Sequence, residues 1–245
     1  VPARSGGRPT TAPRPRVPWA LLGLLVILIV NALFLRFNSF RTFNFFDMGS
    51  FLDASWRVFR GQRPYIDFIY TTGPVHLYMN AFFFLLFGFG KSAILTHLIT
   101  MSSAVIVLCY LTFRKLLPLW ITLLLTLFAA TGFYWSYPHP WYDQSAYFWG
   151  ILALWFLMPR LPLKGARTAY AAGALSGGCS VLSLLTKTNI GGAFGLAFFV
   201  YLLFESERWR ALLGFAVGAL AAAAVMAVLI GAPAKYVEQA LLSYG

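Results

Sequence analysis

Charged residues are scarce in this sequence, and acidic residues are the scarcest of all. Of 245 residues only 11% are charged, with 7 acidic residues against 19 basic ones, while 60% are hydrophobic. A water-soluble core of this size does not need so much apolar sequence, so the composition argues against an ordinary soluble domain. We therefore expect an integral membrane protein with an all-α, polytopic helical fold.

Other absences narrow the function. The two cysteines, Cys109 and Cys179, both fall in apolar segments, which argues against a disulfide framework or a zinc site and predicts inert packing residues. The sequence has no GxGxxG or P-loop pattern that would indicate a nucleotide site. The net charge of +12 does not indicate nucleic acid, because the basic residues are dispersed between apolar segments rather than gathered on one domain.

Long apolar runs are abundant. Runs of about 20 residues, the length needed to cross the hydrocarbon core, recur along the chain. Residues 1–17 are rich in Pro, Gly and Arg and are predicted to form a disordered basic cytoplasmic tail, followed by one transmembrane domain over residues 18–245. We predict about seven transmembrane helices, at Pro18–Leu35, Lys91–Phe113, Pro118–Trp135, Tyr142–Met158, Thr168–Thr186, Ile190–Phe204 and Ala211–Ile230. Glycine-rich patches in the last third, GALSGG and GFAVGAL, predict close helix packing.

The basic residues indicate the orientation. With the N-terminus in the cytoplasm, 11 of the 19 basic residues fall on the cytoplasmic side. Of the other 8, five lie in a long first outer loop over residues 36–90 and a sixth, Lys91, directly follows it, so the short loops show the expected bias. All four aspartates then face outward, which places any chemistry on the extracytoplasmic side.

The first outer loop is predicted to hold two interfacial helices. Over Met48–Arg60 the apolar residues recur at helical spacing, so that an aromatic face would enter the headgroup boundary. Asp53 and Arg57, four residues apart, are expected to form a surface ion pair on the other face. The apolar run Val75–Phe87 is too short to span and is expected to lie in the interface, after an extended piece PYIDFIY.

The order of motifs in this loop resembles a known family. These motifs are Phe46-Asp47, Gly49, an amphipathic helix ending at Gly61, Pro64-Tyr65, Asp67-Phe68, Gly73-Pro74 and Leu86-Phe87-Gly88. The pattern resembles the polytopic GT-C glycosyltransferases related to protein O-mannosyltransferases and lipid A aminoarabinose transferases. The segments SYPHPWYD and LLTKTNIGG look like the second outer loop and the end of the fifth span of that family.

The resemblance implies a membrane glycosyltransferase that uses a sugar linked to a polyprenyl phosphate, on the outer face of a bacterial inner (plasma) membrane. Asp47 matches the position of the catalytic aspartate and would act as general base in an inverting transfer. Two departures stand out: Met48 occupies a position where many relatives have Glu, and relatives generally continue beyond the length of this chain. The sequence is therefore expected to be an N-terminal portion.

Phosphate departure calls for positive charge, because negative charge grows on its oxygens in the transition state. Lys187 is the first candidate for that role, and a snorkelling interfacial lysine is its alternative. Lys91 is a weaker candidate for the same role. The further candidates for substrate binding are Arg57, Arg60, Asp67, His76, His97, His139 and Asp143. For His76, which shares a helix face with Asn80, a satisfied interfacial histidine is the competing interpretation.

The resemblance implies no cofactor, and a second carboxylate as general acid is unnecessary because a phosphate leaves readily. A divalent metal held by Asp47, His139 and Asp143 is the alternative. The expected partners are the lipid-linked donor, membrane lipids and other membrane subunits. Two other functions compete: a non-catalytic subunit or scaffold of a larger complex, and a lipid flippase or transporter, although the sequence shows no internal repeat of the kind many transporters have.

Overall fold

The fold is helical throughout the part of the chain that the computed structural model describes, which is residues 17–39, 41, 45–134, 139–158, 163 and 165–242. Within those residues the extended pairing is limited to an isolated bridge between Pro64 and Phe68. The helices are α1 (Val17–Asn38), α2 (Phe45–Phe59), α3 (Val75–Phe87), α4 (Lys91–Leu116), α5 (Leu119–Tyr134), α6 (Tyr142–Leu157), α7 (Ala166–Leu184), α8 (Thr188–Leu203), α9 (Arg208–Ile230), α10 (Pro233–Tyr236) and a π-helical turn η2 (Val237–Leu242). Residues 1–16 lie outside the described part, so the expected disordered tail stays a prediction.

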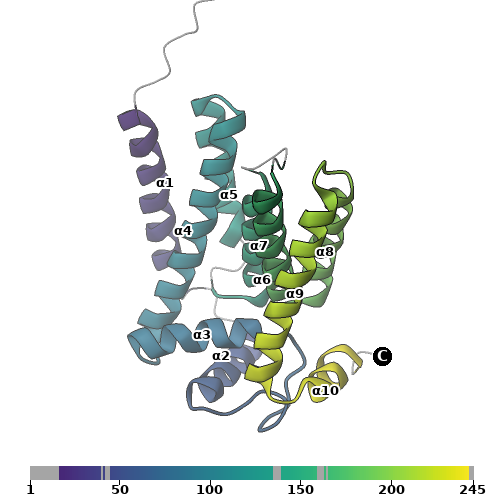
Figure 1. Cartoon of the computed structure of the whole chain (residues 1–245). Coiled ribbons are helices and arrows are strands. Elements are labelled where there is room, and N and C mark those ends of the chain that lie inside the picture. Colours follow the sequence, from purple (N-terminus) through teal and green to yellow (C-terminus); the bar gives the residue numbers. More distant parts are fainter. Residues whose placement is uncertain are drawn as a thin grey trace, which may run out of the picture.

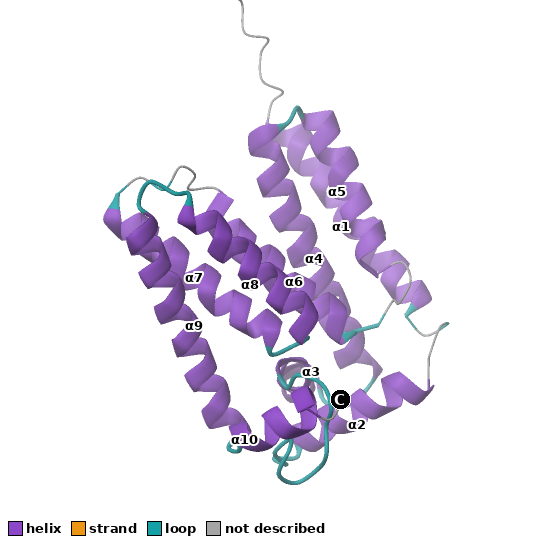
Figure 2. Cartoon of the chain, turned by 90° about the vertical axis from the view of Figure 1, so that its right-hand side faces the viewer, coloured by secondary structure: helices purple, strands orange, loops and turns teal. Residues whose placement is uncertain are grey.

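Seven of these helices form an up-and-down bundle. Figure 1 shows α1 and α4–α9 running in alternating directions, with α2, α3 and α10 gathered at one end. We call this end the loop end, since it carries the first outer loop. Seen from the side in Figure 2, the bundle divides into α1, α4 and α5 on one hand and α6–α9 on the other, with α2 and α3 crossing beneath both groups.

In the part of the chain that the structure describes, three helices are long and apolar enough to cross a membrane: Trp19–Asn38, Lys91–Leu116 and Arg208–Ile230. They expose large apolar side chains along their length, including Leu21, Leu25 and Val228. Such surfaces are favourable in lipid rather than in water, and the chain is therefore membrane-associated. The helices α5, α6 and α8 have 16 residues each, which at about 1.5 Å per residue is roughly 24 Å and shorter than the hydrocarbon core.

Glycines hold α7 against α9 at backbone contact. A Cβ atom added to Gly177 would lie 2.1 Å from the carbonyl oxygen of Phe215, and one added to Gly218 would lie 1.8 Å from that of Ala174. Gly173 and Gly214 make equivalent approaches one turn earlier on each helix. The four-residue spacing puts these glycines on one face of each helix, which confirms the predicted close packing.

The first outer loop departs from expectation in two respects. The structure has helices at both predicted places, but the buried face of α2 is covered by protein: Met48 and Phe51 pack with Leu77 of α3 and with Trp141. Burial against α3 thus covers part of this face, while Trp56 remains exposed, and the interfacial position of α2 stays a prediction. The piece PYIDFIY is not extended throughout but turns at residues 65–67, where the Arg63 carbonyl accepts from the Asp67 N–H at 2.9 Å.

Candidate functional site

Lys187 lies at the hairpin between α7 and α8, at the loop end. Lys187 is extended, with φ −149° and ψ 113°, and it separates the end of α7 from the start of α8. The two helices can turn so tightly because Gly191 has no side chain: a Cβ there would fall 2.0 Å from the Leu184 nitrogen. This turn fixes where the lysine projects.

The first outer loop packs directly onto this hairpin. A Cβ atom on Gly73 would lie 2.0 Å from the Leu185 carbonyl oxygen, so only glycine allows the contact. The next amide but one, that of Val75, donates to the same Leu185 oxygen at 3.3 Å. The Gly73-Pro74 pair, which the sequence offered only as one motif of the family resemblance, therefore joins the first outer loop to the Lys187 turn.

The ammonium of Lys187 forms an ion pair with the carboxylate of Asp143, in the first turn of α6. The same ammonium lies 4.8 Å from the centroid of the Tyr142 ring. Both members of the pair are about one-third exposed, 30% for Lys187 and 33% for Asp143. The structure thus brings together two predicted site residues that are 44 positions apart in the sequence.

A polar cavity of about 440 Å³ opens beside this pair. We call it the Lys187 cavity. It is lined by hydroxyl and amide side chains together with Lys187 and the Tyr142 ring, and its walls come from the first outer loop, α6, the α7–α8 hairpin and η2. The lining residues are Thr71, Thr72, Gly73, Tyr142, Thr186, Lys187, Thr188, Asn189 and Ala240. Hydroxyl and amide groups can both donate and accept hydrogen bonds, as recognition of a polyhydroxylated ligand requires.

Tyr65 braces the wall of the Lys187 cavity. Its backbone has φ +67°, a conformation that bulky residues rarely adopt, and its side chain is buried. The Tyr65 hydroxyl donates to the Thr72 carbonyl at 2.5 Å, and Gln239 of η2 donates to the Tyr65 carbonyl at 3.3 Å. Burial is the largest cause of the strongly raised pKa of Tyr65, so the hydroxyl stays protonated and keeps its donor role.

A buried polar network ties the first outer loop to α4 and α6. His97 Nδ1 lies 2.6 Å from Asn80 Oδ1, and Asn80 Nδ2 lies 2.9 Å from His76 Nε2. His76 Nδ1 in turn lies 3.0 Å from the Ser145 hydroxyl, and Asn80 Nδ2 also donates to Ser55 at 3.2 Å. All of these side chains are buried, so their bonds are isolated from solvent.

One assignment of hydrogens satisfies every bond in this network. Asn80 donates to His76 Nε2, which must therefore be unprotonated, and His76 then carries its proton on Nδ1 and donates to Ser145. The Ser145 hydroxyl in turn donates a hydrogen bond to the Trp141 carbonyl at 3.2 Å. Burial lowers the pKa of His76 to about 3, which agrees with a neutral ring.

The three predicted substrate-binding histidines are all buried. His76 and His97 lie in the network and line neither the Lys187 cavity nor the basic cavity described below, as far as the described residues show. His139 is buried next to Trp141, with ring centroids 5.5 Å apart, and burial lowers its pKa to about 4. Their roles toward a substrate stay predictions.

The other candidates in the loop lie on its surface. Arg57 forms the expected ion pair with Asp53 at 2.7 Å, which confirms that prediction. Arg60 lies 5.9 Å from the centroid of the Trp56 ring. The carboxylate of Asp67 accepts the Arg63 amide at 2.6 Å and stabilises the turn. The backbone of Asp47 belongs to the first turn of α2, but its side chain lies outside what the structure describes.

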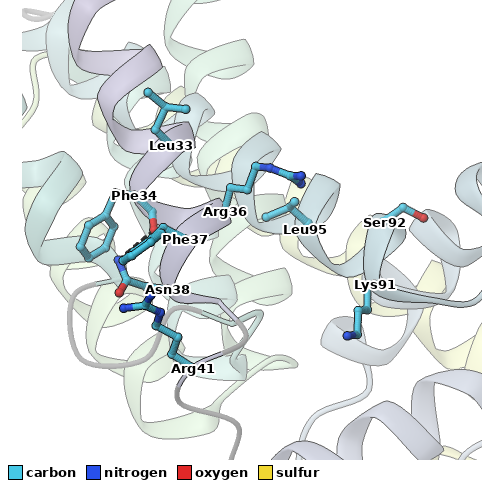
Figure 3. Close-up of a pocket in the computed structure, with 9 residues that line it drawn as sticks. All are labelled: Leu33, Phe34, Arg36, Phe37, Asn38, Arg41, Lys91, Ser92 and Leu95. Atoms are coloured by element: carbon cyan, nitrogen blue, oxygen red, sulfur yellow. Dashed lines mark hydrogen bonds between the residues drawn. The ribbon is translucent and has the colours of Figure 1, made fainter.

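A second, larger cavity lies at the same end of the molecule, between the end of α1 and the start of α4. It has a volume of about 940 Å³ and is lined by three cationic side chains, Arg36, Arg41 and Lys91, together with apolar ones (Figure 3). We call it the basic cavity. Sequence reasoning counted Arg36 and Arg41 only as loop charges, because nothing in their spacing showed that α4 would return beside them.

No group of three or more His, Cys, Asp or Glu residues within the described part of the chain could hold a metal ion. Of the predicted ligand set, Asp143 is paired with Lys187, while the Asp47 side chain is outside the described residues. Comparison with protein-family models, with curated proteins and with solved structures gave no match.

Proposed function

We propose that this chain is a membrane glycosyltransferase that moves a sugar from a polyprenyl-phosphate donor to an acceptor hydroxyl on the extracytoplasmic face. One observation carries the proposal most directly: a polar cavity with a positioned lysine opens at the same end of the bundle as the helix that begins around Asp47. The resemblance of residues 47–88 to GT-C enzymes supports it.

The topology belongs to the proposal as well. We propose that α1 and α4–α9 all cross a bacterial plasma membrane, with the N-terminus in the cytoplasm and the loop end outside. Their alternating directions and the concentration of interhelical polar contacts at the loop end favour this arrangement. The short helices α5, α6 and α8 would require local thinning of the bilayer or burial of their ends by neighbouring elements. The exposed apolar residues at the end of α3, such as Leu85 and Leu86, favour its contact with the interface.

In the proposed reaction Asp47 accepts the proton of the acceptor hydroxyl while its oxygen attacks the anomeric carbon with inversion. The bond from that carbon to the phosphate oxygen breaks, and the phosphate leaves with the electron pair. A general base contributes about 10²–10⁴ in rate. Lys187, held by Asp143, would offset the charge that grows on the leaving phosphate, while the threonine hydroxyls and Asn189 of the Lys187 cavity would bind sugar hydroxyls.

Turnover by the full-length gene product in nanodiscs tests the proposal. We expect Asp47→Asn to abolish sugar transfer from a panel of polyprenyl-phosphate sugars while leaving the fold intact. Asp53→Asn is the matched control, because it makes the same change on the exposed face of the same helix and should retain activity. Normal turnover by folded Asp47→Asn would exclude Asp47 as the base.

Donor binding, measured separately from turnover, tests the role of Lys187. Lys187→Ala should weaken binding of the lipid-linked sugar more than Asp47→Asn does, because a deleted cation and a deleted base fail at different steps. Lys235→Ala removes an exposed lysine from the same end and serves as the control. An equal loss in Lys187→Ala and Lys235→Ala would remove Lys187 from the site.

The scaffold function has one observation in its favour. Met48, which stands where many GT-C relatives have Glu, is only 1% exposed and packs in the apolar cluster between α2 and α3. A residue so placed contributes packing rather than chemistry. If the folded wild type neither binds nor consumes any donor, a non-catalytic subunit becomes the better account, and co-purification would then identify its partners.

A further inference from the structure

The basic cavity joins charged and apolar surfaces at one end of two spanning-length helices. Its walls come from the last turns of α1, from the turn that follows it and from the first turns of α4. In Figure 3, Arg36 projects from α1 on the side of Leu95, Arg41 folds back against Phe37, and Lys91 projects from the start of α4. Residues 36 and 91 are brought together only because α4 packs beside α1.

Arg41 is held in a way that suits an anion. Its guanidinium carbon lies 3.6 Å from the centroid of the Phe37 ring, so one face of the group is stacked. A stacked guanidinium still presents its N–H groups at its edge, in the fork geometry that matches the oxygens of a phosphate. Arg36 is exposed and lines the same cavity, where it adds a second guanidinium group.

The apolar part of the lining faces outward. Leu33 is 61% exposed and Phe37 60%. The exposed apolar surface continues along α1, where only 22% of the most apolar 18-residue stretch is buried inside the protein. A hydrocarbon chain lying along this surface would bring its polar end to the level of Arg36, Arg41 and Lys91. The Lys187 cavity differs, since hydroxyl groups and one lysine held by Asp143 line it.

We propose that the basic cavity binds the phosphate group of a membrane lipid, with the lipid chain lying along α1. The three cations provide the charge complementarity, and the exposed Leu33 and Phe37 provide the surface for the chain. A bulk anionic phospholipid and a polyprenyl phosphate share this chemistry. The binding does not depend on sugar transfer, so this site and the proposed function stand or fall separately.

Native mass spectrometry of the purified full chain tests the site, with phosphatidylglycerol, polyprenyl phosphate, zwitterionic phosphatidylcholine and inorganic phosphate as probes. Arg36→Gln/Arg41→Gln should weaken retention of phosphatidylglycerol by about 30-fold, since each cation near the membrane surface increases affinity for an anionic lipid roughly fivefold. Arg36→Lys/Arg41→Lys keeps the charge and should restore most of the binding.

Arg114→Gln/Lys115→Gln is the matched control, because it removes two charges from the opposite end of α4. Retention unchanged in the Arg36/Arg41 variant, or reduced equally in this control, would overturn the proposal. Displacement of the bound lipid by inorganic phosphate alone at matched concentration would also overturn the proposal, because the hydrocarbon chain of the lipid would then contribute nothing to binding. Preferential retention of phosphatidylglycerol or of polyprenyl phosphate supports the site and identifies which lipid supplies the phosphate.

A third variant keeps the test decisive if Arg36→Gln/Arg41→Gln does not fold. Lys91→Gln alone should weaken retention by about fivefold, and full retention by this folded variant would count against the site. Asp47→Asn should bind the lipid as the wild type does even if it has lost turnover, which separates a failure of this proposal from a failure of sugar transfer.

Discussion

The α7–α9 pair and the α3–α4 pair are held by opposite means. Where α7 and α9 come closest, no side chain intervenes: Gly177 and Gly218 bring one backbone against another. Between α3 and α4, polar side chains make the contact, with Asn80 and two histidines in a buried network of hydrogen bonds. The first joint should fail when atoms are added, whereas the second should fail when a partner or a proton is changed.

The largest expected effect comes from breaking the network at its centre. Asn80→Leu keeps a similar volume but leaves His76, His97 and Ser55 each without a partner they have in the wild type. An unsatisfied buried polar group costs about 1–3 kcal/mol, so we expect a loss of roughly 3–5 kcal/mol in the free energy of unfolding. Denaturant unfolding in detergent would show it, and a loss below 1 kcal/mol would mean that the network contributes little.

The corresponding test of the glycine joint is Gly218→Ala. The added Cβ would lie 1.8 Å from the Ala174 carbonyl oxygen, so α7 and α9 must separate. Overpacking of this kind costs about 1–3 kcal/mol. Gly178→Ala is the matched control, since its Cβ would lie 3.5 Å from the nearest atom and should be tolerated. Equal thermal shifts in the two variants would contradict the account of the joint.

The buried network and the α7–α9 glycine contact should also differ in how their contribution to stability depends on pH. Because the folded pKa of His76 is about 3 and its ordinary value is 6.5, the unfolded chain binds a proton that the folded chain does not between these values. Stability from this residue is complete above pH 6.5 and declines by about 1.4 kcal/mol per pH unit as the pH falls towards 3.

The comparison of wild type with His76→Gln isolates this term. Their difference in unfolding free energy should shrink as the pH is lowered from 6.5, whereas Gly218→Ala should keep a constant difference from wild type. A wild-type minus His76→Gln difference that does not change with pH would show that the ring is not a source of acid sensitivity.

The smallest effect on stability is expected at the ion pair. Asp143 and Lys187 are each about one-third exposed, and pairs in such positions contribute roughly 0–1 kcal/mol because solvent screens them. Asp143→Asn should therefore leave the unfolding free energy nearly unchanged. If instead it destabilises the protein as much as Asn80→Leu does, the pair belongs with the buried network rather than with the cavity wall.

The apolar runs of the sequence predicted the positions of these helices well. The predicted spans at Lys91–Phe113, Tyr142–Met158 and Ala211–Ile230 fall on α4, α6 and α9 to within a few residues. The length and hydropathy of a run are local properties, and a helix satisfies its own backbone within that run. Which element covers a given helix face is not a local property of the sequence. This is why the apolar face of α2, expected at the headgroup boundary, is found packed in part against α3.

The candidate site was predictable only in part. Lys187 and Asp143 stand out as rare charges in apolar sequence, yet their pairing depends on how α6 meets the α7–α8 hairpin. Gly73 was noted only as part of the Gly73-Pro74 motif, and the sequence around it does not indicate its contact with Leu185. Arg36 and Arg41 looked like loop charges until α4 placed Lys91 beside them.

The sequence by itself determined that this protein is helical and membrane-associated, because scarce charge and long apolar runs leave the backbone no other way to satisfy its hydrogen bonds in lipid. Only the tertiary structure decided which polar groups meet. His97 joins His76 and Asn80 in one buried network because α4 packs beside α3, and Lys91 joins Arg36 and Arg41 in one cavity because α4 also packs beside α1. Such contacts are set by the shape of packed surfaces, which no local pattern encodes.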